Sequence, residues 1–285
     1  MKLTSIIQYF LPQHALSWLA GKILSSQHVR LKNALIRKFI STYHVNMQEA
    51  AQSDLAAYPS FHDFFIRHLK PGVRTFPLND KIIASPVDGT ISQIGLLRGN
   101  QLIQAKAKSF SLEALLASEE AATSFMDGAF TTIYLAPKDY HRIHMPVTGQ
   151  LRRMIFIPGK LFSVNPQTVA DIDNIFARNE RLVCLFDTAL GPCAVILVGA
   201  IVVGSMAVTW HGNVTPKQRN KPTVWDYPVH GEGSFQLKQG DELGYFTAGS
   251  TVILLFGKER MQWGVDYEAG NAVKLGEGLG QARHT

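Results

Sequence analysis

The stretch Thr247-Ala248-Gly249-Ser250-Thr251 runs directly into the apolar segment Val252-Ile253-Leu254-Leu255-Phe256. A continuous apolar run behind a short Gly-Ser turn is typical of a buried β-strand. Glycine permits a sharp bend and leaves the carbonyl before Ser250 open to close approach. Because Gly and Ser are also common turn residues, the simplest interpretation of this stretch is a turn that enters a strand.

Short apolar or alternating segments of the same kind recur from about residue 80 onward, separated by Gly, Pro, Asn and Asp. They predict strands at 82–84, 89–94, 102–105, 131–135, 154–157, 182–186, 194–198 and 201–203, with a helix at 111–118. Strands at this spacing, without regular alternation with helices, favour an antiparallel sheet over a doubly wound fold. The predicted class is therefore α+β: N-terminal amphipathic helices followed by a mostly antiparallel, sheet-like or barrel-like catalytic body.

Residues 1–48 form a basic arm with many apolar side chains. The arm contains Lys2, Lys22, Arg30, Lys32, Arg37 and Lys38 but no acidic residue, and it accounts for the whole formal net charge of +6. Pro12 divides residues 3–24 into two short helical pieces, so no apolar run approaches the ~20 residues that span a bilayer. No signal-peptide cleavage pattern follows the basic start.

This composition favours helices that lie in the interface of an anionic membrane, rather than a site for nucleic acid. An amphipathic helical pair packed on the body is the alternative interpretation. We expect residues 1–48 to be a membrane-docking region and residues 49–285 to form the catalytic domain. Cys184 and Cys193 lie nine positions apart without a metal-ligand pattern, so we expect two reduced core residues.

Three further segments contain residues that could carry chemistry. Ser85-Pro86-Val87-Asp88-Gly89-Thr90 places a carboxylate in a turn between two predicted strands. Tyr140-His141-Arg142-Ile143-His144-Met145-Pro146 places two histidines three positions apart. His-x-x-His is also a metal-ligand spacing, but no cysteine lies nearby and a third ligand would have to be Asp139 or come from elsewhere, so we predict no metal.

A serine hydroxyl is a weak nucleophile that requires an adjacent base, and a histidine oriented by a carboxylate is the usual one. Asp88, His144 and Ser250 form such a triad only if the fold brings three distant segments together. Gly204-Ser205 and Gly233-Ser234 are other Gly-Ser bonds, but neither precedes Thr and a long apolar strand, so both are interpreted as turns.

Together these segments resemble the phosphatidylserine decarboxylase family, in its bacterial membrane-associated form. Ser60-Phe61-His62-Asp63-Phe64-Phe65-Ile66-Arg67 is similar to the family's Phe-x-x-Phe-Phe-x-Arg segment, and Ser60 is expected to cap a helix. The family's usual Leu-Gly-Ser-Thr is Ala-Gly-Ser-Thr here, a change one residue before the reacting pair. The resemblance covers about residues 60 to 260.

The resemblance implies that the chain cuts itself between Gly249 and Ser250, and that Ser250 becomes a covalent pyruvoyl group, so that no external cofactor is required. It assigns the catalytic aspartate to Asp88, activation of the serine to His144 and the decarboxylation chemistry to His141. Phosphatidylserine would be converted to phosphatidylethanolamine and carbon dioxide at the cytoplasmic face of the inner membrane. The segment 158–166, with Phe162, Ser163 and Asn165, is expected to line the substrate pocket. The enzyme is expected to consist of the long and short chains of one precursor and to form a homodimer.

Two other functions fit the same residues. A serine hydrolase would use Asp88, His144 and Ser250 on an external substrate and would keep its chain intact. A non-enzymatic membrane-binding module would use the Gly-Ser and His-x-x-His segments only as structural turns.

Overall fold

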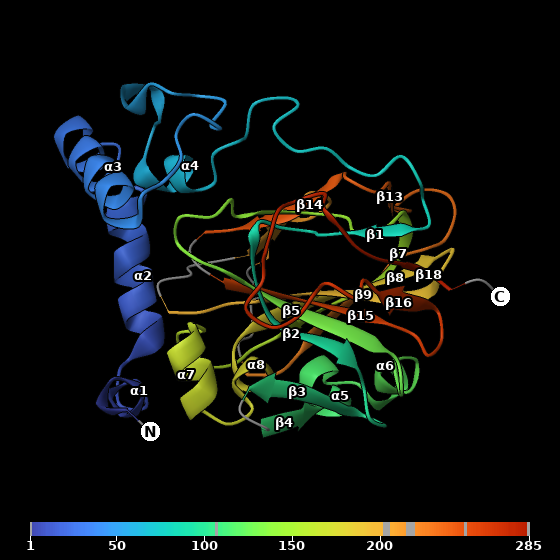
Figure 1. Cartoon of the computed structure of the whole chain (residues 1–285). Helices are drawn as coiled ribbons and strands as arrows, with labels where there is room; N and C mark the ends of the chain where they lie inside the picture. The colour runs from blue at the N-terminus through green and yellow to red at the C-terminus, as the bar shows by residue number, and fades with distance from the viewer. Residues whose placement is uncertain (1, 106–107, 202–205, 215–219, 248–249, 284–285) are drawn as a thin grey trace.

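The computed structural model describes residues 2–105, 108–201, 206–214, 220–247 and 250–283. Figure 1 shows a column of N-terminal helices standing against one side of a β-rich body. The column contains α1 (Leu3–Ile7), α2 (Gln13–Leu24), α3 (Val29–Tyr43), the 3-10 turn η1 (Leu55–Ala57) and α4 (Phe61–Phe65). This arrangement confirms the predicted order of helices followed by a sheet.

Local sequence signals set the ends of these helices. Pro12 immediately precedes α2 and separates it from α1, as predicted. Ser60 Oγ accepts a hydrogen bond from the Asp63 N–H at 3.2 Å, so the predicted cap of α4 is confirmed. Of the helices in the described residues, none combines the length and the apolar character needed to cross a membrane.

The helical column has a small hydrophobic core of its own. Ile36 of α3 packs there with Phe64 and Phe65 of α4, and all three side chains are buried. The Phe39 ring meets the rings of Phe64 and Phe65 edge-on, at centroid distances of 6.0 and 5.9 Å. Such edge-to-face contacts add to the free energy gained from burial. The α3–α4 pair is therefore held together independently of the body.

Polar contacts attach the start of the arm to the body. Ser5 Oγ donates a hydrogen bond to Asp171 at 2.8 Å, and Gln8 Oε1 accepts one from the Ser163 N–H at 2.8 Å. Farther along, the Arg142 side chain donates from Nε to the Ile66 carbonyl at 2.7 Å, just after α4. The helical column, from α1 to α4, is thus anchored near both of its ends.

The body is built on a nine-stranded antiparallel sheet in the order β12-β7-β8-β9-β15-β5-β2-β17, with β13 also paired to β7. Its strands are β2 (Gly89–Leu96), β5 (Ala129–Leu135), β7 (Gly149–Ile157), β8 (Arg181–Thr188), β9 (Gly191–Val198), β12 (Thr223–Asp226), β13 (Gln236–Leu237), β15 (Ser250–Phe256) and β17 (Ala272–Val273). The apolar run that opened the sequence analysis is β15, which lies between β9 and β5. All its residues are buried, which explains a continuous rather than an alternating apolar pattern.

Smaller sheets and short helices complete the body. A four-stranded sheet contains β6 (Arg142–His144), β10 (Met206–Val208), β11 (Gly212–Asn213) and β14 (Glu242–Phe246). A three-stranded sheet contains β1 (Ile82–Ala84), β16 (Met261–Trp263) and β18 (Gly278–Ala282), and a hairpin is formed by β3 (Gln101–Ala105) and β4 (Lys108–Ser111). The helices are α5 (Leu112–Leu116), α6 (Glu119–Thr123), α7 (Pro166–Asp171) and α8 (Ile175–Arg178).

Most predicted elements are present, and the differences are local. The predicted strands from 82–84 to 194–198 all coincide with observed strands, whereas Ile201 lies in a turn and 202–203 are outside the described residues. The two edge strands of the large sheet, β12 and β17, do not pair with each other within the described residues, so the body is not a closed barrel. Cys184 and Cys193 are buried and unbridged, as predicted.

Candidate functional site

Ser250 is the first residue of β15, opposite Leu135 of β5. Its side chain is completely buried, and its Oγ has no hydrogen-bond partner among the described residues. A buried hydroxyl without a partner is costly, so it is expected where the group has a chemical task. Ala248 and Gly249, which include the predicted cleavage position, lie outside the described residues. Gly233 and Ser234 do lie in a turn region, whereas Gly204 and Ser205 are not described.

His141 lies at the end of the loop that follows β5. Its Nδ1 is 2.9 Å from the Asp139 carbonyl, which can only accept, so Nδ1 carries the proton. Nε2 is then a lone-pair acceptor, and it is buried without a partner in the described part of the chain. The imidazole packs on the Phe65 ring at 4.2 Å, and complete burial lowers the pKa of His141 to about 3. The ring is therefore neutral at physiological pH.

The same backbone segment connects His141 with the chain that leads to Ser250. The His141 carbonyl accepts a hydrogen bond from the Phe246 N–H at 3.1 Å, at the end of β14. Phe246 precedes Ser250 by four residues. The structure therefore brings His141 and the start of β15 to the same region, although no hydrogen bond joins their side chains among the described residues.

His144 ends β6 and has a different environment. Its Nδ1 donates to the Gly240 carbonyl at 2.8 Å, and its Nε2 is 3.3 Å from the Tyr140 hydroxyl. Partial burial lowers the pKa of His144, and the Gly240 hydrogen bond only partly opposes this effect. Because Nδ1 carries the proton, Nε2 has the lone pair, which accepts the hydrogen bond from the Tyr140 hydroxyl and can take up a proton. The ring therefore has the tautomer and the charge state that a general base requires.

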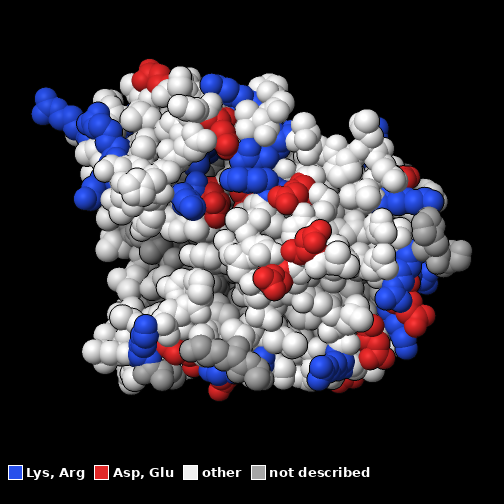
Figure 2. Space-filling model, viewed as in Figure 1, with Lys and Arg blue, Asp and Glu red and all other residues white. Residues whose placement is uncertain are grey.

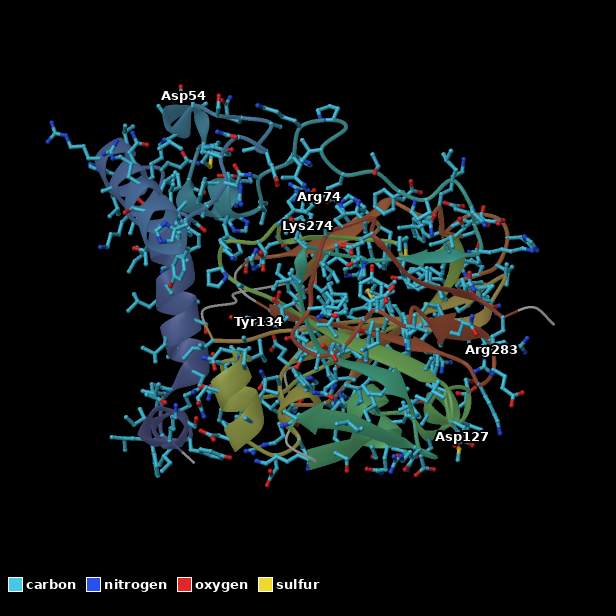
Figure 3. The ribbon with its side chains drawn as sticks, viewed as in Figure 1. Asp54, Arg74, Asp127, Tyr134, Lys274 and Arg283 are labelled. Atoms are coloured by element: carbon cyan, nitrogen blue, oxygen red, sulfur yellow. The ribbon has the colours of Figure 1, made fainter. Side chains whose placement is uncertain are left out.

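Asp88 lies in the turn immediately before β2. The next residue, Gly89, has no room for a side chain, because a Cβ at that position would lie 2.5 Å from the Tyr134 carbonyl oxygen. The Asp88 carboxylate accepts hydrogen bonds from Arg74 Nε at 2.9 Å and from the Leu275 N–H at 2.8 Å. Lys274 Nζ is 3.4 Å from the same carboxylate, and Figure 3 shows Arg74 and Lys274 close together above the sheet.

The charge state of Asp88 follows from these partners. Burial acts to raise the pKa of Asp88, but the hydrogen bonds from Arg74 and Leu275 outweigh it and lower the pKa below its ordinary range. Arg74 also pairs with Glu49 at 2.7 Å, so its guanidinium joins two carboxylates. Asp88 is therefore an ionised group at the centre of a charged network.

The predicted triad is only partly assembled in this geometry. The His144 N–H donates to the Pro86 carbonyl at 2.9 Å, so the Asp88 turn and β6 are neighbours. Within the described residues, however, no hydrogen bond joins the Asp88 and His144 side chains, and none joins His144 to Ser250. The Gly240 carbonyl, rather than Asp88, accepts the proton of His144 Nδ1 here.

Sequence reasoning missed the partners of Asp88. Arg74 is 14 positions before it and Leu275 is 187 positions after it, and no spacing pattern connects them. The Leu275 contact is made by the main chain, for which the sequence carries no signal at all. Tyr140 was identified as part of the histidine motif, but its contact with His144 depends on the loop conformation.

Two cavities border the loop that follows β5. The larger, about 460 Å³, lies between the helical column and the body; its lining residues are Leu24, Phe39, Tyr43, Phe61, Phe65, Tyr134, Pro137, Ser163, Val164, Asn165, Ala200 and Ile201. Two of the expected pocket residues, Ser163 and Asn165, are thus in the lining of this apolar cavity. Phe162 is not among them: it is buried against Tyr9, with ring centroids 5.1 Å apart.

The smaller cavity, about 180 Å³, has a polar lining of His44, Asn46, Glu49, Arg67, Leu69, Asp88, Lys138, Asp139, Tyr140 and Lys274. Charged atoms of both signs gather at the top of Figure 2, where the helical column meets the body. Neither cavity contains a cluster of metal ligands: no group of three or more His, Cys, Asp or Glu side chains suited to a metal occurs in the part of the chain that the structure describes.

Comparisons with known proteins point to one family. The family model for phosphatidylserine decarboxylase matches residues 61–281, and a second model, described as PSD, matches residues 3–44. The phosphatidylserine decarboxylase proenzyme of Acidovorax ebreus is 50% identical over 273 residues, which cover 95% of each chain. The proenzyme of Marinobacter nauticus is 50% identical over 282 residues, 98% of each chain, and that of Vibrio parahaemolyticus 48% over 271 residues, 95% of each.

Proposed function

The chain belongs to the phosphatidylserine decarboxylase family, and from this premise we propose that it is a self-cleaving proenzyme whose mature form decarboxylates phosphatidylserine. The products are phosphatidylethanolamine and carbon dioxide. Cleavage falls between Gly249 and Ser250 and leaves a long chain and a short chain, 250–285. The observation that carries this proposal is Ser250 itself, a buried serine at the first position of a central strand, whose Oγ has no hydrogen-bond partner among the described residues.

In the proposed maturation, Ser250 Oγ attacks the Gly249 carbonyl while its proton passes to a base. The peptide C–N bond breaks, an ester forms, and the Ser250 nitrogen becomes a free amine. Loss of the Cα proton then expels the Gly249 carboxylate and leaves dehydroalanine, whose imine tautomer takes up water and releases ammonia. The start of the short chain is then a pyruvoyl group.

His144 is our candidate for the base in the first step. Its Nδ1–H is held by the Gly240 carbonyl, so the lone pair is on Nε2, and its lowered pKa keeps the ring neutral. The ionised Asp88 lies on the neighbouring turn and would stabilise the imidazolium that forms. In the geometry described here Asp88 is held by Arg74, so it acts through its charge rather than through a hydrogen bond to the ring.

The proposed pyruvoyl group would lie where Ser250 stands, at the start of β15 and in the same region as His141. A pyruvoyl group supplies an electron sink for the electrons that carbon dioxide leaves behind. His141, whose buried Nε2 has no partner among the described residues, is our candidate to move the proton that replaces the lost carboxylate.

The arm is proposed to dock on an anionic membrane surface, peripherally and at the cytoplasmic face of the inner membrane. The buried residues of α2 are the polar Gln13 and Ser17, whereas Trp18 and Leu19 are 62% and 51% exposed. Phe10, between α1 and α2, is 83% exposed. An exposed apolar patch of this kind marks an interaction surface. The apolar cavity, which Leu24 at the end of α2 helps to line, would admit acyl chains.

Intact-mass analysis under denaturing conditions tests the proposal, with wild type beside Ser250→Ala. Wild type should give two pieces that divide at Gly249, the shorter carrying a carbonyl in place of its amine, and Ser250→Ala should give one. Ser234→Ala, which changes the Gly233-Ser234 pair, is the matched control and should mature normally. A single intact wild-type chain that reacts with a fluorophosphonate would instead establish a serine hydrolase.

A further inference from the structure

The polar cavity contains a buried arginine that the reaction described above does not use. Arg67 follows α4 and is only 5% exposed. It lines the 180 Å³ cavity together with Asp88 and with Lys138, Asp139 and Tyr140, which precede His141 in the same loop. Arg67 is therefore next to the catalytic loop without belonging to it.

Most of the hydrogen-bonding capacity of Arg67 is unused. Its Nη2 donates to the Lys138 carbonyl at 3.2 Å, and its guanidinium carbon is 5.3 Å from the Phe64 ring. Nε and Nη1 are buried and have no partner among the described residues. A guanidinium has five N–H donors and stays charged, so leaving several of them dry and unpaired costs stability. Such a cost is expected where a ligand completes the site.

The carboxylates around the cavity do not meet this need. Asp88 is held by Arg74 and the Leu275 N–H, and Glu49 is also held by Arg74. The Asp139 carboxylate accepts a hydrogen bond from the Ala136 N–H at 2.8 Å. Within the described residues, each carboxylate of the cavity thus has a partner other than Arg67. Asp88 and Asp139 favour the charged guanidinium of Arg67 through space, but no acceptor among the described residues reaches its Nε or Nη1. An anion bound in the cavity would supply that acceptor.

We propose that Arg67 binds the phosphodiester group of the phospholipid substrate. This inference rests on the proposed function and names the subsite that holds the headgroup. The substrate also has a carboxylate, but that charge is lost as carbon dioxide, and holding it would stabilise the ground state more than the transition state. The phosphodiester keeps its charge throughout, and a planar fork of N–H donors matches its oxygens.

The test uses the mature enzyme and a soluble short-chain phosphatidylserine. Arg67→Gln should raise KM by about 10- to 100-fold with little change in kcat, because uniform binding is lost. Arg67→Lys keeps the charge without the fork and should give an intermediate KM. Arg152→Gln removes an exposed, ion-paired arginine and is the matched control, expected to leave KM unchanged.

Inhibition distinguishes the two anions of the substrate. Short-chain phosphatidylethanolamine and glycerophosphoethanolamine have the phosphodiester but no carboxylate, so Arg67→Gln and Arg67→Lys should weaken both as competitive inhibitors by the same factor that raises KM. Inorganic phosphate is tested as a free anion. If it inhibits wild type competitively but no longer inhibits the two variants, Arg67 forms an anion site that accepts phosphate without the lipid.

Unchanged KM and unchanged inhibition in both variants would overturn the proposal, and so would a loss confined to phosphatidylserine, which would assign Arg67 to the carboxylate. Intact mass of each variant separates this failure from that of the proposed function, because a mature, pyruvoyl-bearing variant with wild-type KM contradicts only the Arg67 subsite. If Arg67→Gln does not mature, Arg67→Lys and wild-type inhibition by glycerophosphoethanolamine decide.

Discussion

The end of β5 and the loop that follows it line two cavities that differ in their chemistry. Tyr134 and Pro137 border the apolar cavity of about 460 Å³, whereas Lys138 and Asp139 border the polar cavity of about 180 Å³. In Figure 3, Tyr134 lies between the helical column and the sheet, and Lys274 and Arg74 lie above it. A substrate with apolar chains and a charged headgroup requires such a division, and His141 comes directly after the loop residues that separate the two environments.

Replacing the two histidines should have the largest effect, and it tests whether the loop between the cavities serves two different steps. His144→Ala should abolish self-cleavage, because His144 is the proposed base that takes the Ser250 proton. His141→Ala should cleave normally but lose about 10²- to 10⁴-fold in kcat, the usual contribution of a proton-transfer group. Intact mass measures the first step and carbon dioxide release the second.

The result of this experiment is informative in either direction. Normal cleavage of His144→Ala would remove it from maturation, and full activity of His141→Ala would clear it of the decarboxylation step. A chain with both changes should behave like His144→Ala, since cleavage comes first.

Removing the charge of Arg74, beside the polar cavity, should have the next largest effect, and it should appear in the free energy of unfolding. Arg74→Gln leaves Asp88 without its main partner in a pair whose side chains are 9% and 4% exposed. Breaking a buried ion pair from one side costs about 3–5 kcal/mol, and we expect that loss in the free energy of unfolding. Arg152→Gln breaks an exposed pair with Asp187 and should cost no more than about 1 kcal/mol. Urea denaturation of the cleavage-deficient Ser250→Ala chain gives both values, and equal losses would show that the polar network is no stronger than a surface pair.

Lowering the pH should slow self-cleavage gradually, by less than the histidine replacements do. Burial holds the pKa of His144 below its ordinary value of 6.5, so the ring is neutral at pH 7 and becomes protonated as the pH falls through the lowered value. The cleavage rate should then be flat near neutrality and fall about tenfold per unit below that pKa. A rate that falls already above 6.5 would contradict a buried, neutral His144 as the base.

Stability has to be followed in the same pH series. The folded chain keeps His141 neutral down to a pKa of about 3, while the unfolded chain takes up that proton near pH 6.5. Between these values the unfolded state binds more protons, so the free energy of unfolding decreases as the pH falls. Near-UV circular dichroism at each pH distinguishes slow cleavage from loss of the fold.

Changes in the arm should have the smallest effect on the reaction, and they test whether its exposed apolar side chains bind the membrane. Phe10→Ser with Trp18→Ser removes two exposed side chains without touching either cavity, and should weaken sedimentation with anionic vesicles by about tenfold or more. Activity on soluble short-chain phosphatidylserine should stay unchanged. Lys22→Gln removes one charge and should weaken vesicle binding about fivefold at low salt and less at high salt. Unchanged vesicle binding in all variants would place the docking surface elsewhere.

The sequence was sufficient where the signal is local. The β15 run, the strands from 82–84 to 194–198 and the Ser60 cap each depend on neighbouring residues, and these were predicted. What it missed depends on tertiary packing. The Phe65 ring that shields His141 from water comes from α4. The hydrogen bonds to Asp88 come from Arg74, which precedes it in the sequence, and from Leu275, which follows it. No periodicity reports such contacts, because each partner would look ordinary at its own position.

The position of β15 has a consequence for how long the enzyme lasts. It lies between β5 and β9, in the interior of the large sheet, while Leu275 and β17 and β18 attach the rest of the short chain to the body. The precursor folds as one molecule, but after the cut the same sheet would have to form from two molecules that meet in solution. Unfolding of the mature enzyme is then practically irreversible, so its working lifetime is set by the rate at which β15 leaves the sheet rather than by an equilibrium.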